Sequence, residues 1–426
     1  KEIWQGISRN LKQALSENLT FADTHALPLV LDKNKIVYNT NPPILENFLF
    51  RNQLYDLLNC EGADRAPHLK YVRDFYNAET KFKEGGRSTL VREKDLPKFK
   101  KGKATAIVPF TFGKESLTSV ALCQEVGIEP ILVYCQEPVQ PYEQKYKLAA
   151  LKRFSREFGV KYYFLQNDPG LFRYGKAFGL KKPTEIGWGT QTTILAMLMA
   201  PFAVKHQAKY ILFGSEYSNN EFVYRNGWKE FLSCDQTNEN TNNQNNIVRL
   251  LTNDQCHVRS TFQPLDEINI FFMLHHRYPE YGKYQFSCSA EYPLIKGSQW
   301  CHKCYKCARM SLFAACCGVD YRKIGFKKDL MNEPNMFGHY FGDKFATGSN
   351  QELDFSFSIL LRKKYLSPYV RQFAKEKTQR LFYSWPEMKH HFSFMKNYEH
   401  LPEEYQGKMA KIYKQELAQF RKILPR

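Results

Sequence analysis

The feature that most constrains the fold is a regular alternation of apolar strands and helical segments between Ala104 and Gly214. Four short apolar runs are interpreted as buried strands, and three longer segments with helical patterns separate them. The predicted strands are, in chain order, ATAIVPF, EPILVYC, KYYFLQ and KYILFGS. Strands that alternate with helices at this spacing are typical of a parallel sheet with helices on both faces. We therefore predict an α/β fold in which ligands bind at the carboxyl ends of the strands.

The composition is that of a large folded protein. The chain has 426 residues, of which 43% are hydrophobic and 15% aromatic. This length allows one large domain with extensions or two domains. The longest apolar segment, Ile194 to Val204, is much shorter than the roughly 20 residues that span a bilayer. We therefore expect no membrane contact and a cytoplasmic location.

A short turn between the first predicted strand and the first predicted helix has the residues of an anion site. The turn is TFGKES, Thr111 to Ser116, and the helix after it points free backbone N–H groups at whatever lies above the turn. Gly113 lets the backbone approach closely, Lys114 adds a cation and Ser116 offers a hydroxyl. The turn is not a Walker loop, which requires GxxxxGK[ST]. We expect a phosphate here, with the Lys114 side chain in a solvent-filled crevice.

This turn resembles the SGGxDS loop of PP-loop ATP pyrophosphatases, enzymes that bind ATP and break it between the α and β phosphates. Gly113 and Ser116 are identical to the family pattern. Thr111 in place of Ser and Glu115 in place of Asp keep a hydroxyl and a carboxylate. Phe112 in place of the first Gly restricts the backbone conformations that the turn can adopt. The resemblance implies an HUP-type fold and an ATP site formed by Thr111, Phe112, Gly113, Lys114, Glu115 and Ser116, with Lys114 and Ser116 in catalytic roles.

The ends of later strands extend the resemblance. In the family the end of the second strand helps to hold adenine, and here it has Tyr134, which would stack on the base, and Cys135, whose backbone would contact the base edge. A plain buried strand end is an equal alternative for these two residues. Gly189 precedes the start of the third predicted helix, so a second helix amino terminus is expected to face the same crevice.

The segment LFGSEYSNNE follows the fourth predicted strand. It resembles the GNExS-type segment of the muramoyl-peptide glutamate epimerase group of PP-loop proteins. The resemblance implies that Gly214, Glu216 and Asn219 hold Mg²⁺, ribose or substrate, with Glu216 in a catalytic role. Glu115, Glu216 and Asp235 are the candidate Mg²⁺ ligands, because Mg²⁺ takes one or two carboxylates and keeps several waters. A helix-capping serine in this segment is the alternative.

Four cysteines predict a metal site. Cys301, Cys304 and Cys307 form a CxxCxxC run, and the earlier Cys288 supplies a fourth thiolate. Four thiolates around one ion suit zinc in a closed, structural site. Iron–sulfur ligation is an alternative, and four unrelated reduced thiols are another. Arg309 and nearby lysines are expected to offset the charge of the thiolates. The run also resembles the zinc segment of 7-cyano-7-deazaguanine synthases, which are PP-loop enzymes with an earlier Ser-Cys dipeptide as in this chain.

The two resemblances imply an adenylating enzyme with ATP, Mg²⁺ and Zn²⁺ as cofactors. It would activate a carboxylate of a small acidic or peptide-like substrate, in a glutamate-epimerase-like or an amide- or nitrile-forming reaction. The formal charge of +18 agrees with a phosphate-bearing ligand but identifies none. One alternative is a PP-loop enzyme that modifies tRNA, whose phosphates the basic carboxyl-terminal region would hold. The other is a nucleotide-binding module in which Phe112 has abolished catalysis.

We divide the chain into four regions. These are an amino-terminal α+β extension (1–103), a PP-loop nucleotide-binding domain (104–287), a zinc-binding segment (288–320) and a helical, basic carboxyl-terminal region (321–426). In the extension we expect strands in HALPLVLD and KIVYNT and a helix over ENFLFRNQLYDLLN. The polar segment Thr237–Asn246 is expected to be a mobile loop, because it cannot bury apolar surface. Near the end, helices are expected over PEMKHHFSFMKNYEHL and PEEYQGKMAKIYKQELAQFRKIL.

Overall fold

The structure is a computed structural model. It describes residues 2–31, 33–44, 69–83, 86–100, 104–136, 141–173, 188–225, 228–231, 233–290, 292–341, 350–376 and 383–426, and the single positions 46, 102, 179, 378 and 381.

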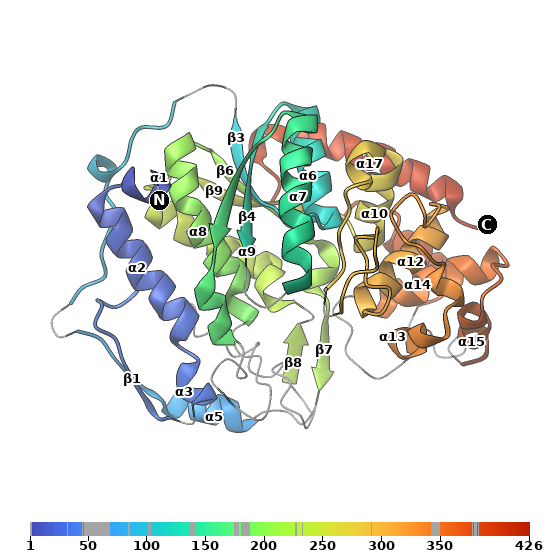
Figure 1. Ribbon diagram of the computed structural model, residues 1–426, viewed down its shortest axis with the longest axis horizontal. Helices are drawn as coiled ribbons and strands as arrows, with labels where there is room; N and C mark the ends of the chain where they lie inside the picture. The colour runs from blue at the N-terminus through green and yellow to red at the C-terminus, as the bar shows by residue number, and fades with distance from the viewer. Residues whose placement is uncertain are drawn as a thin grey trace.

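A five-stranded parallel sheet forms the centre of the molecule (Figure 1). Its strands are β3 (Thr105–Pro109), β4 (Glu129–Gln136), β5 (Lys161–Gln166), β6 (Tyr210–Glu216) and β9 (His257–Phe262). They lie in the order β5-β4-β3-β6-β9. The prediction of an α/β fold with a parallel sheet is confirmed, and four of the five strands were predicted. The strand β9 was not predicted, because Arg259 and Ser260 interrupt its apolar pattern.

Helices cover both faces of this sheet because successive side chains of a strand point to opposite sides. On one face Ile107 and Val133 share a core cluster with α8 (Gln191–His206) and α9 (Asn238–Leu251). On the other face Val108 and Leu132 pack in a cluster with α6 (Lys114–Val126) and α7 (Pro141–Phe158). The strands point toward the side of the molecule on which the hairpin of β7 (Phe222–Arg225) and β8 (Trp228–Phe231) lies (Figure 1).

The prediction of a mobile loop at Thr237–Asn246 is wrong, because most of this segment is the first part of α9. The Thr237 side chain caps the helix by accepting a hydrogen bond from Asn240 N at 3.2 Å. Buried amides find partners on neighbouring segments: Gln244 Nε2 donates to Asp235 O at 3.0 Å, and Asn245 Oδ1 accepts from Val258 N at 3.0 Å. Polar side chains are tolerated in the interior when they are hydrogen-bonded, which the composition alone does not reveal.

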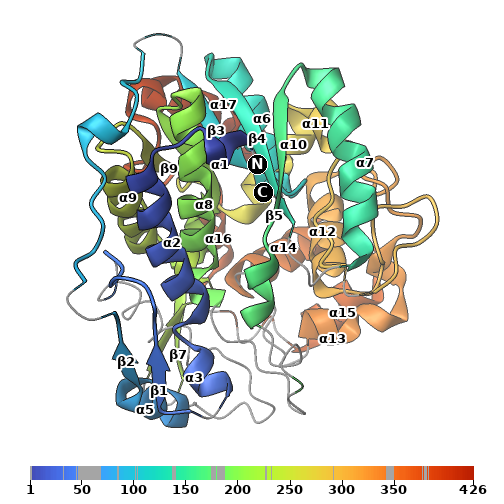
Figure 2. The ribbon, with the colours of Figure 1, turned by 60° about the vertical axis from the view of Figure 1, so that its left-hand side comes forward.

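The amino-terminal extension is a mixture of helices and short strands, as predicted. Its described elements are α1 (Glu2–Gln5), α2 (Arg9–Thr24), α3 (Leu27–Val30), β1 (Lys35–Val37), α5 (Leu69–Asn77) and β2 (Glu79–Lys81), with β1 and β2 paired in parallel. The α2 helix lies along α8 in both views (Figures 1 and 2), and Leu11 and Leu15 share a core cluster with Ile194 and Met197.

Two predictions in the extension have different outcomes. The strand expected in KIVYNT is confirmed as β1. The strand expected in HALPLVLD is wrong, because α3 occupies this segment and Pro28 lies in its first turn, where the fixed φ of proline favours a helix. The helix expected over 46–59 lies, apart from its first position, outside the described residues.

The carboxyl-terminal region is helical, as predicted, and packs on α6 and α10. The helices after β9 are α10 (Glu267–His276), α11 (Pro279–Gly282), α12 (Tyr305–Cys317), α13 (Phe337–Phe341), α14 (Asn350–Arg362), α15 (Pro368–Glu376), α16 (Trp385–His391) and α17 (Gln406–Ile423). The rings of Phe272 on α10 and Phe420 on α17 lie 5.3 Å apart. None of the described helices is both long and apolar enough to cross a bilayer.

The helix predicted over 402–424 is confirmed as α17, but the helix predicted over 386–401 is too long. It ends at His391, and the following segment turns to the chain after β9. There Lys396 N donates to Pro264 O at 3.0 Å, and His400 N donates to Gln263 Oε1 at 2.9 Å. These tertiary hydrogen bonds replace those that a longer helix would have made.

Candidate functional site

The order of the strands reverses between β3 and β6. From β3 the chain adds β4 and β5 on one side, then crosses to add β6 and β9 on the other. In open parallel sheets, ligands bind outside the carboxyl ends of the strands at such a switch point. The turn before α6 and the 3-10 turn η5 (Tyr217–Asn220) follow these two strand ends. Gly214 permits their close approach, since a Cβ there would lie 2.5 Å from Glu115 Cβ.

Phe112 has the left-handed backbone conformation that glycine adopts most easily, with φ of +61°. Its ring is fully buried, 4.6 Å from the ring of Phe110 and 5.8 Å from that of Phe154. Phe286 N also donates to Phe112 O at 2.8 Å. The strain of this conformation, roughly 1–2 kcal/mol, is offset by the aromatic packing. The turn therefore keeps a glycine-like backbone shape although the residue is phenylalanine.

Hydrogen bonds within the turn fix its shape. Ser116 Oγ donates to Gly113 O at 3.1 Å and accepts from Thr111 N at 3.3 Å. Gly113 is the N-cap of α6, and because it has no side chain it cannot accept a hydrogen bond from the first N–H groups of the helix. Lys114 N donates to Ser287 Oγ at 3.3 Å, so the segment before the cysteine cluster also contacts the start of α6.

The Lys114 side chain does not lie in a solvent-filled crevice, so that expectation is wrong. It is 3% exposed and its ammonium is surrounded by carboxylates. Nζ lies 2.8 Å from Glu267 Oε1 and 3.8 Å from Glu216 Oε2, and it also pairs with Glu115. Burial disfavours the charged lysine, but the three carboxylates outweigh it and raise the pKa of Lys114 above its ordinary value.

The side chains of Glu115, Glu216 and Glu267 form the carboxylate group of this site, with oxygens within 4.8 Å of one another. They come from the first turn of α6, the end of β6 and the first turn of α10. Burial raises the pKa of Glu216 to about 8. Lys114 opposes this rise, and the neighbouring carboxylates add to it. Burial also acts on Glu267, but Arg309 and Lys114 lower the pKa of its carboxyl group below the ordinary value.

Glu216 is nine-tenths buried, and its two oxygens differ. Oε1 accepts from Ser218 Oγ at 3.1 Å. Oε2 has no hydrogen-bond partner among the described residues, and it points toward Lys114 and the other carboxylates. A buried polar atom of this kind needs an explanation, for which an absent ion or water is the usual one.

A second buried cation supports the carboxylate group. Arg309 on α12 pairs through Nε with Glu267 and through Nη2 with Glu352 Oε2 at 3.0 Å. Glu352 Oε1 in turn accepts from Ile268 N at 2.6 Å. Arg309 was expected to offset the charge of the cysteine thiolates, and the structure instead pairs it with these two glutamates. This network joins α10, α12 and α14 beside the switch point.

Glu267 and Glu352 were not predicted as site residues, and Arg309 was expected beside the cysteine cluster. Only Arg309 carried a signal in the sequence, since it is an isolated charge before the apolar run of ARMSLFAA. Such a charge is almost never fully buried unless it is paired. Glu267 follows Asp266, and Glu352 is close to Asp354, so no such signal marked these two residues.

The four predicted cysteines form a compact cluster of buried thiols. The Sγ–Sγ distances are 3.7 Å for Cys288–Cys304, 3.8 Å for Cys301–Cys307, 3.5 Å for Cys304–Cys307 and 3.7 Å for Cys288–Cys307. A regular tetrahedron with Zn–S bonds of about 2.3 Å has sulfurs about 3.8 Å apart. The cluster therefore fits one tetrahedrally bound metal ion such as zinc.

Backbone groups around the cluster favour thiolates. Ala290 N donates to Cys288 Sγ at 3.3 Å, and Lys303 N donates to Cys301 Sγ at 3.4 Å. Cys304 is the N-cap of α12 and Cys307 lies in the first turn of this helix, where the helix dipole stabilises negative charge. All four ligand positions are protein sulfurs, so a metal here has no open position for a substrate.

The cysteine cluster and the carboxylate group are connected through two short segments. Phe286 and Ser287, which contact the turn before α6, directly precede Cys288. Arg309, which holds Glu267, lies on α12 within one turn of Cys307. The cluster thus fixes two of the segments that shape the switch-point site.

Three other predicted site residues are outside the carboxylate group. Tyr134 is 1% exposed in the core beside α6 and α7, with its ring 6.0 Å from Lys147 Nζ. A ring covered in this way offers no free face to a base. Cys135 is half-buried at the end of β4. Asn219 is buried in η5, where its Nδ2 donates to Gln236 Oε1 at 3.3 Å.

Asp235 and Gly189 both lie at the start of α8. Asp235 Oδ2 accepts from Thr192 N at 3.2 Å and so caps this helix. Asp235 is not a member of the carboxylate group. Gly189 lies in the 3-10 turn η4 (Trp188–Thr190) that directly precedes α8.

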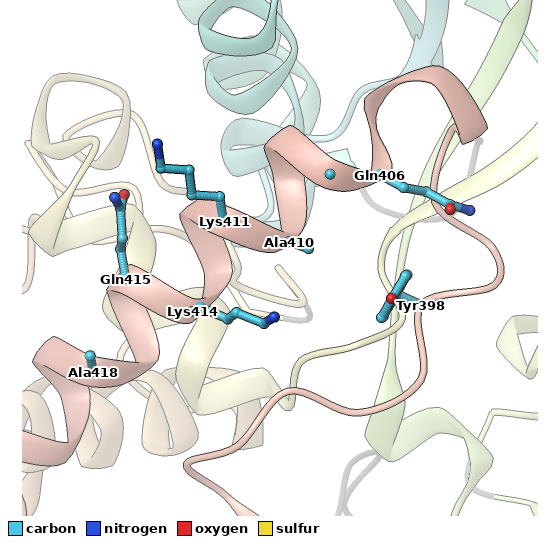
Figure 3. A pocket seen from close by; sticks show the side chains of 8 residues that line it. Tyr398, Gln406, Ala410, Lys411, Lys414, Gln415 and Ala418 are labelled. Atoms are coloured by element: carbon cyan, nitrogen blue, oxygen red, sulfur yellow. The ribbon is translucent and has the colours of Figure 1, made fainter.

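A groove of about 670 Å³ lies along the exposed side of α17 (Figure 3), on the opposite side of the molecule from β7 and β8 (Figures 1 and 2). Lys411 and Lys414 extend from the helix at this groove. The lining residues are Tyr398, Gln406, Gly407, Ala410, Lys411, Lys414, Gln415 and Ala418.

Comparison with known protein families finds no family that matches the chain, and comparison with curated proteins finds no match either. The motifs described above therefore remain the basis for any assignment of function.

Proposed function

We propose that this chain is an ATP-dependent adenylating enzyme of the PP-loop type, with its nucleotide site at the switch point between β3 and β6. The main support is the placement of Lys114. It begins α6 directly above the strand ends and contacts three carboxylates from three different elements. Few structural ion pairs gather so many buried charges at one sheet edge, and strongly shifted pKa values in such a place are typical of functional sites.

The parts of the site match the groups of Mg²⁺-ATP. The N–H of Lys114 donates to Ser287 Oγ, so the N–H groups that follow it in the first turn of α6 would face the phosphates, as helix amino termini do in other phosphate sites. The carboxylate group would bind Mg²⁺ through one or two oxygens and waters. Lys114 would then stabilise the charge that develops on the leaving pyrophosphate.

The reaction would be attack by a substrate carboxylate on the α-phosphorus. A new bond forms between a carboxylate oxygen and this phosphorus, and the bond from the α-phosphorus to its bridging oxygen breaks. The products are an acyl-adenylate and pyrophosphate. A small acidic or peptide-like acceptor is proposed, which agrees with the glutamate-epimerase-like resemblance. The cysteine cluster would bind zinc and act structurally, by holding the segment before Cys288 and the start of α12.

Nucleotide binding tests this proposal without knowledge of the acceptor. The non-cleavable α,β-methylene analogue of ATP, titrated into the protein with Mg²⁺ in a calorimeter, is expected to bind at one site per chain. Turnover with glutamate-containing peptides, followed by ³¹P NMR, is expected to give AMP and pyrophosphate. The absence of nucleotide binding, or the release of ADP and phosphate, would contradict the proposal.

The second candidate is modification of tRNA by the same type of core. It is favoured by the exposed lysines of the α17 groove, Lys411 and Lys414 (Figure 3). We rank it second because these two lysines lie far from the strand ends, on the other side of the molecule. A gel shift with total tRNA at physiological salt decides between the two, since phosphate contacts make binding tight and strongly salt-dependent.

A further inference from the structure

We propose that Glu115, Glu216 and Glu267 form a divalent-cation site, and that the Lys114 ammonium occupies this site until a metal ion replaces it. The inference builds on the proposed function, because it specifies how Mg²⁺ enters the proposed nucleotide site. Its experimental test contains no nucleotide, so the two proposals can fail separately.

The geometry of the carboxylate group is that of a site for a hard cation. Three glutamates place oxygens within 4.8 Å of one another, and they belong to three elements that the fold holds in place. Oxygen ligands of this kind suit Mg²⁺, Ca²⁺ and Mn²⁺. The buried Oε2 of Glu216 lacks a hydrogen-bond partner among the described residues and points into this group. It is therefore a ligand atom with unused capacity.

The charge of the glutamates also favours a divalent ion. Lys114 is the one basic side chain that pairs with Glu115 and Glu216 among the described residues, and it is shared with Glu267. A divalent ion bound by the three glutamates would compensate their charge more completely than this monovalent ammonium does.

The side chains of Arg309 and Lys114 differ in how easily a metal ion could displace them from the glutamates. The Arg309 guanidinium is held by both Glu267 and Glu352, and its planar fork is well suited to such fixed pairs. Lys114 has a flexible four-carbon chain on the first residue of α6. Among the described residues, its ammonium pairs only with carboxylates of the group itself. Lys114 is therefore the cation that a metal ion would displace.

Displacement would link the metal to the phosphate. An ammonium that leaves the carboxylates remains tethered to the start of α6, where the phosphates are proposed to lie. A phosphate would stabilise the displaced lysine, and the lysine would stabilise the phosphate. Binding of metal and nucleotide is then cooperative, and by linkage each tightens the other by the same factor.

The test is a titration with Mn²⁺ alone, followed by electron paramagnetic resonance, on wild type and Lys114→Met. The matched control is Lys323→Met, which removes an exposed lysine after α12. With the competing ammonium gone, Lys114→Met is expected to bind one Mn²⁺ at least about tenfold more tightly than wild type, a difference typical of one lost competing charge. Lys323→Met is expected to bind like wild type.

Further variants keep the test decisive. Adding Glu267→Gln to Lys114→Met removes one ligand and is expected to abolish the tight binding. If Lys114→Met does not fold without metal, Lys114→Gln retains a hydrogen-bond donor and replaces it in the same titration. Equal Mn²⁺ affinity in wild type and the lysine variant would overturn the role of Lys114. No Mn²⁺ binding by either protein would overturn the site, whatever the nucleotide analogue does.

Discussion

The cysteine cluster and the carboxylate group are both sets of side chains that could hold a metal ion, but they are built in opposite ways. The cysteines lie close together in sequence, between Cys288 and Cys307, and their sulfurs are spaced evenly. The glutamates at 115, 216 and 267 come from three distant segments, and a lysine lies among them. The first set has the spacing of four ligands around one ion. The second holds the Lys114 ammonium, which we propose a metal ion displaces.

This difference teaches what each site is able to do. Four sulfurs would close the coordination sphere of a zinc ion, so the metal would hold the chain together and take no substrate. The carboxylates lie at the switch point of the sheet and leave one buried oxygen without a hydrogen bond among the described residues. We therefore expect substitutions in the first set to act on folding, and substitutions in the second to act on both stability and ligand binding.

The largest expected effect is that of Cys304→Ser. It is expected to remove the bound zinc and to unfold the segment around α12, because the free energy of metal binding is part of the free energy of folding. Zinc content by elemental analysis and the thermal unfolding midpoint are the measurements. Cys123→Ser, at a buried cysteine outside the cluster, is the control and should retain one zinc per chain. Iron, or no metal, in freshly prepared wild type would contradict the assignment.

The next largest effect is expected for Lys114→Met in metal-free buffer. Removing one partner of a buried ion pair lowers the free energy of unfolding by about 3–5 kcal/mol. This change should therefore destabilise the fold, whereas removal of an exposed lysine would leave its stability nearly unchanged. Chemical denaturation measures the loss. If the protein turns over ATP, the rate should also fall about 10²-fold or more, since one electrostatic contact to the leaving group is lost. Unchanged stability would show that the lysine is not buried among the carboxylates.

A smaller difference is expected between two variants of Phe112, which lies in the turn before α6. Phe112→Ala should lose about 3–5 kcal/mol because a buried aromatic ring is removed. Phe112→Gly removes the same ring but relieves the left-handed backbone, so it should be more stable than Phe112→Ala by roughly 1 kcal/mol. Denaturant unfolding of the two variants isolates this difference. If Phe112→Gly proved less stable than Phe112→Ala, this result would contradict the positive φ of Phe112 described above.

A further effect is expected in the dependence of stability on pH. Because the pKa of Glu216 is raised to about 8, the folded state holds a proton that the unfolded state releases near the ordinary value of 4.5. Stability should therefore fall as pH rises from 4.5 to 8. Glu216→Gln, which has no proton to lose, should flatten this decline when unfolding is measured at pH 6 and 8. A steeper decline in the variant would contradict the assigned direction.

The sequence predicted the features that depend on neighbouring residues. Apolar runs such as those of β3 and β4 marked four strands, and the CxxCxxC spacing marked the cysteine cluster. It did not predict features that depend on distant partners. The polar residues of α9 were expected to remain in a loop, because nothing local shows that Asp235 and Val258 bind their amides.

The same limit applied to the switch-point site. The turn at Gly113 and the segment at Glu216 were found from their positions after strands. Glu267 begins a helix much later in the chain, so its contact with Lys114 is a property of the tertiary fold. The isolated charge of Arg309 before an apolar run indicated a buried partner, and only the structure shows that Glu267 is one.

The comparison between the two sites is tested most directly by counting metals in one sample. Wild-type protein is dialysed to equilibrium against Mn²⁺ with the α,β-methylene analogue of ATP, and its metals are then measured by elemental analysis before and after a passage through metal-free buffer. We predict one zinc per chain at both stages, and one Mn²⁺ per chain that is present before the passage and lost after it. Loss of zinc together with Mn²⁺, replacement of zinc by Mn²⁺, or no bound Mn²⁺ at equilibrium would contradict the account.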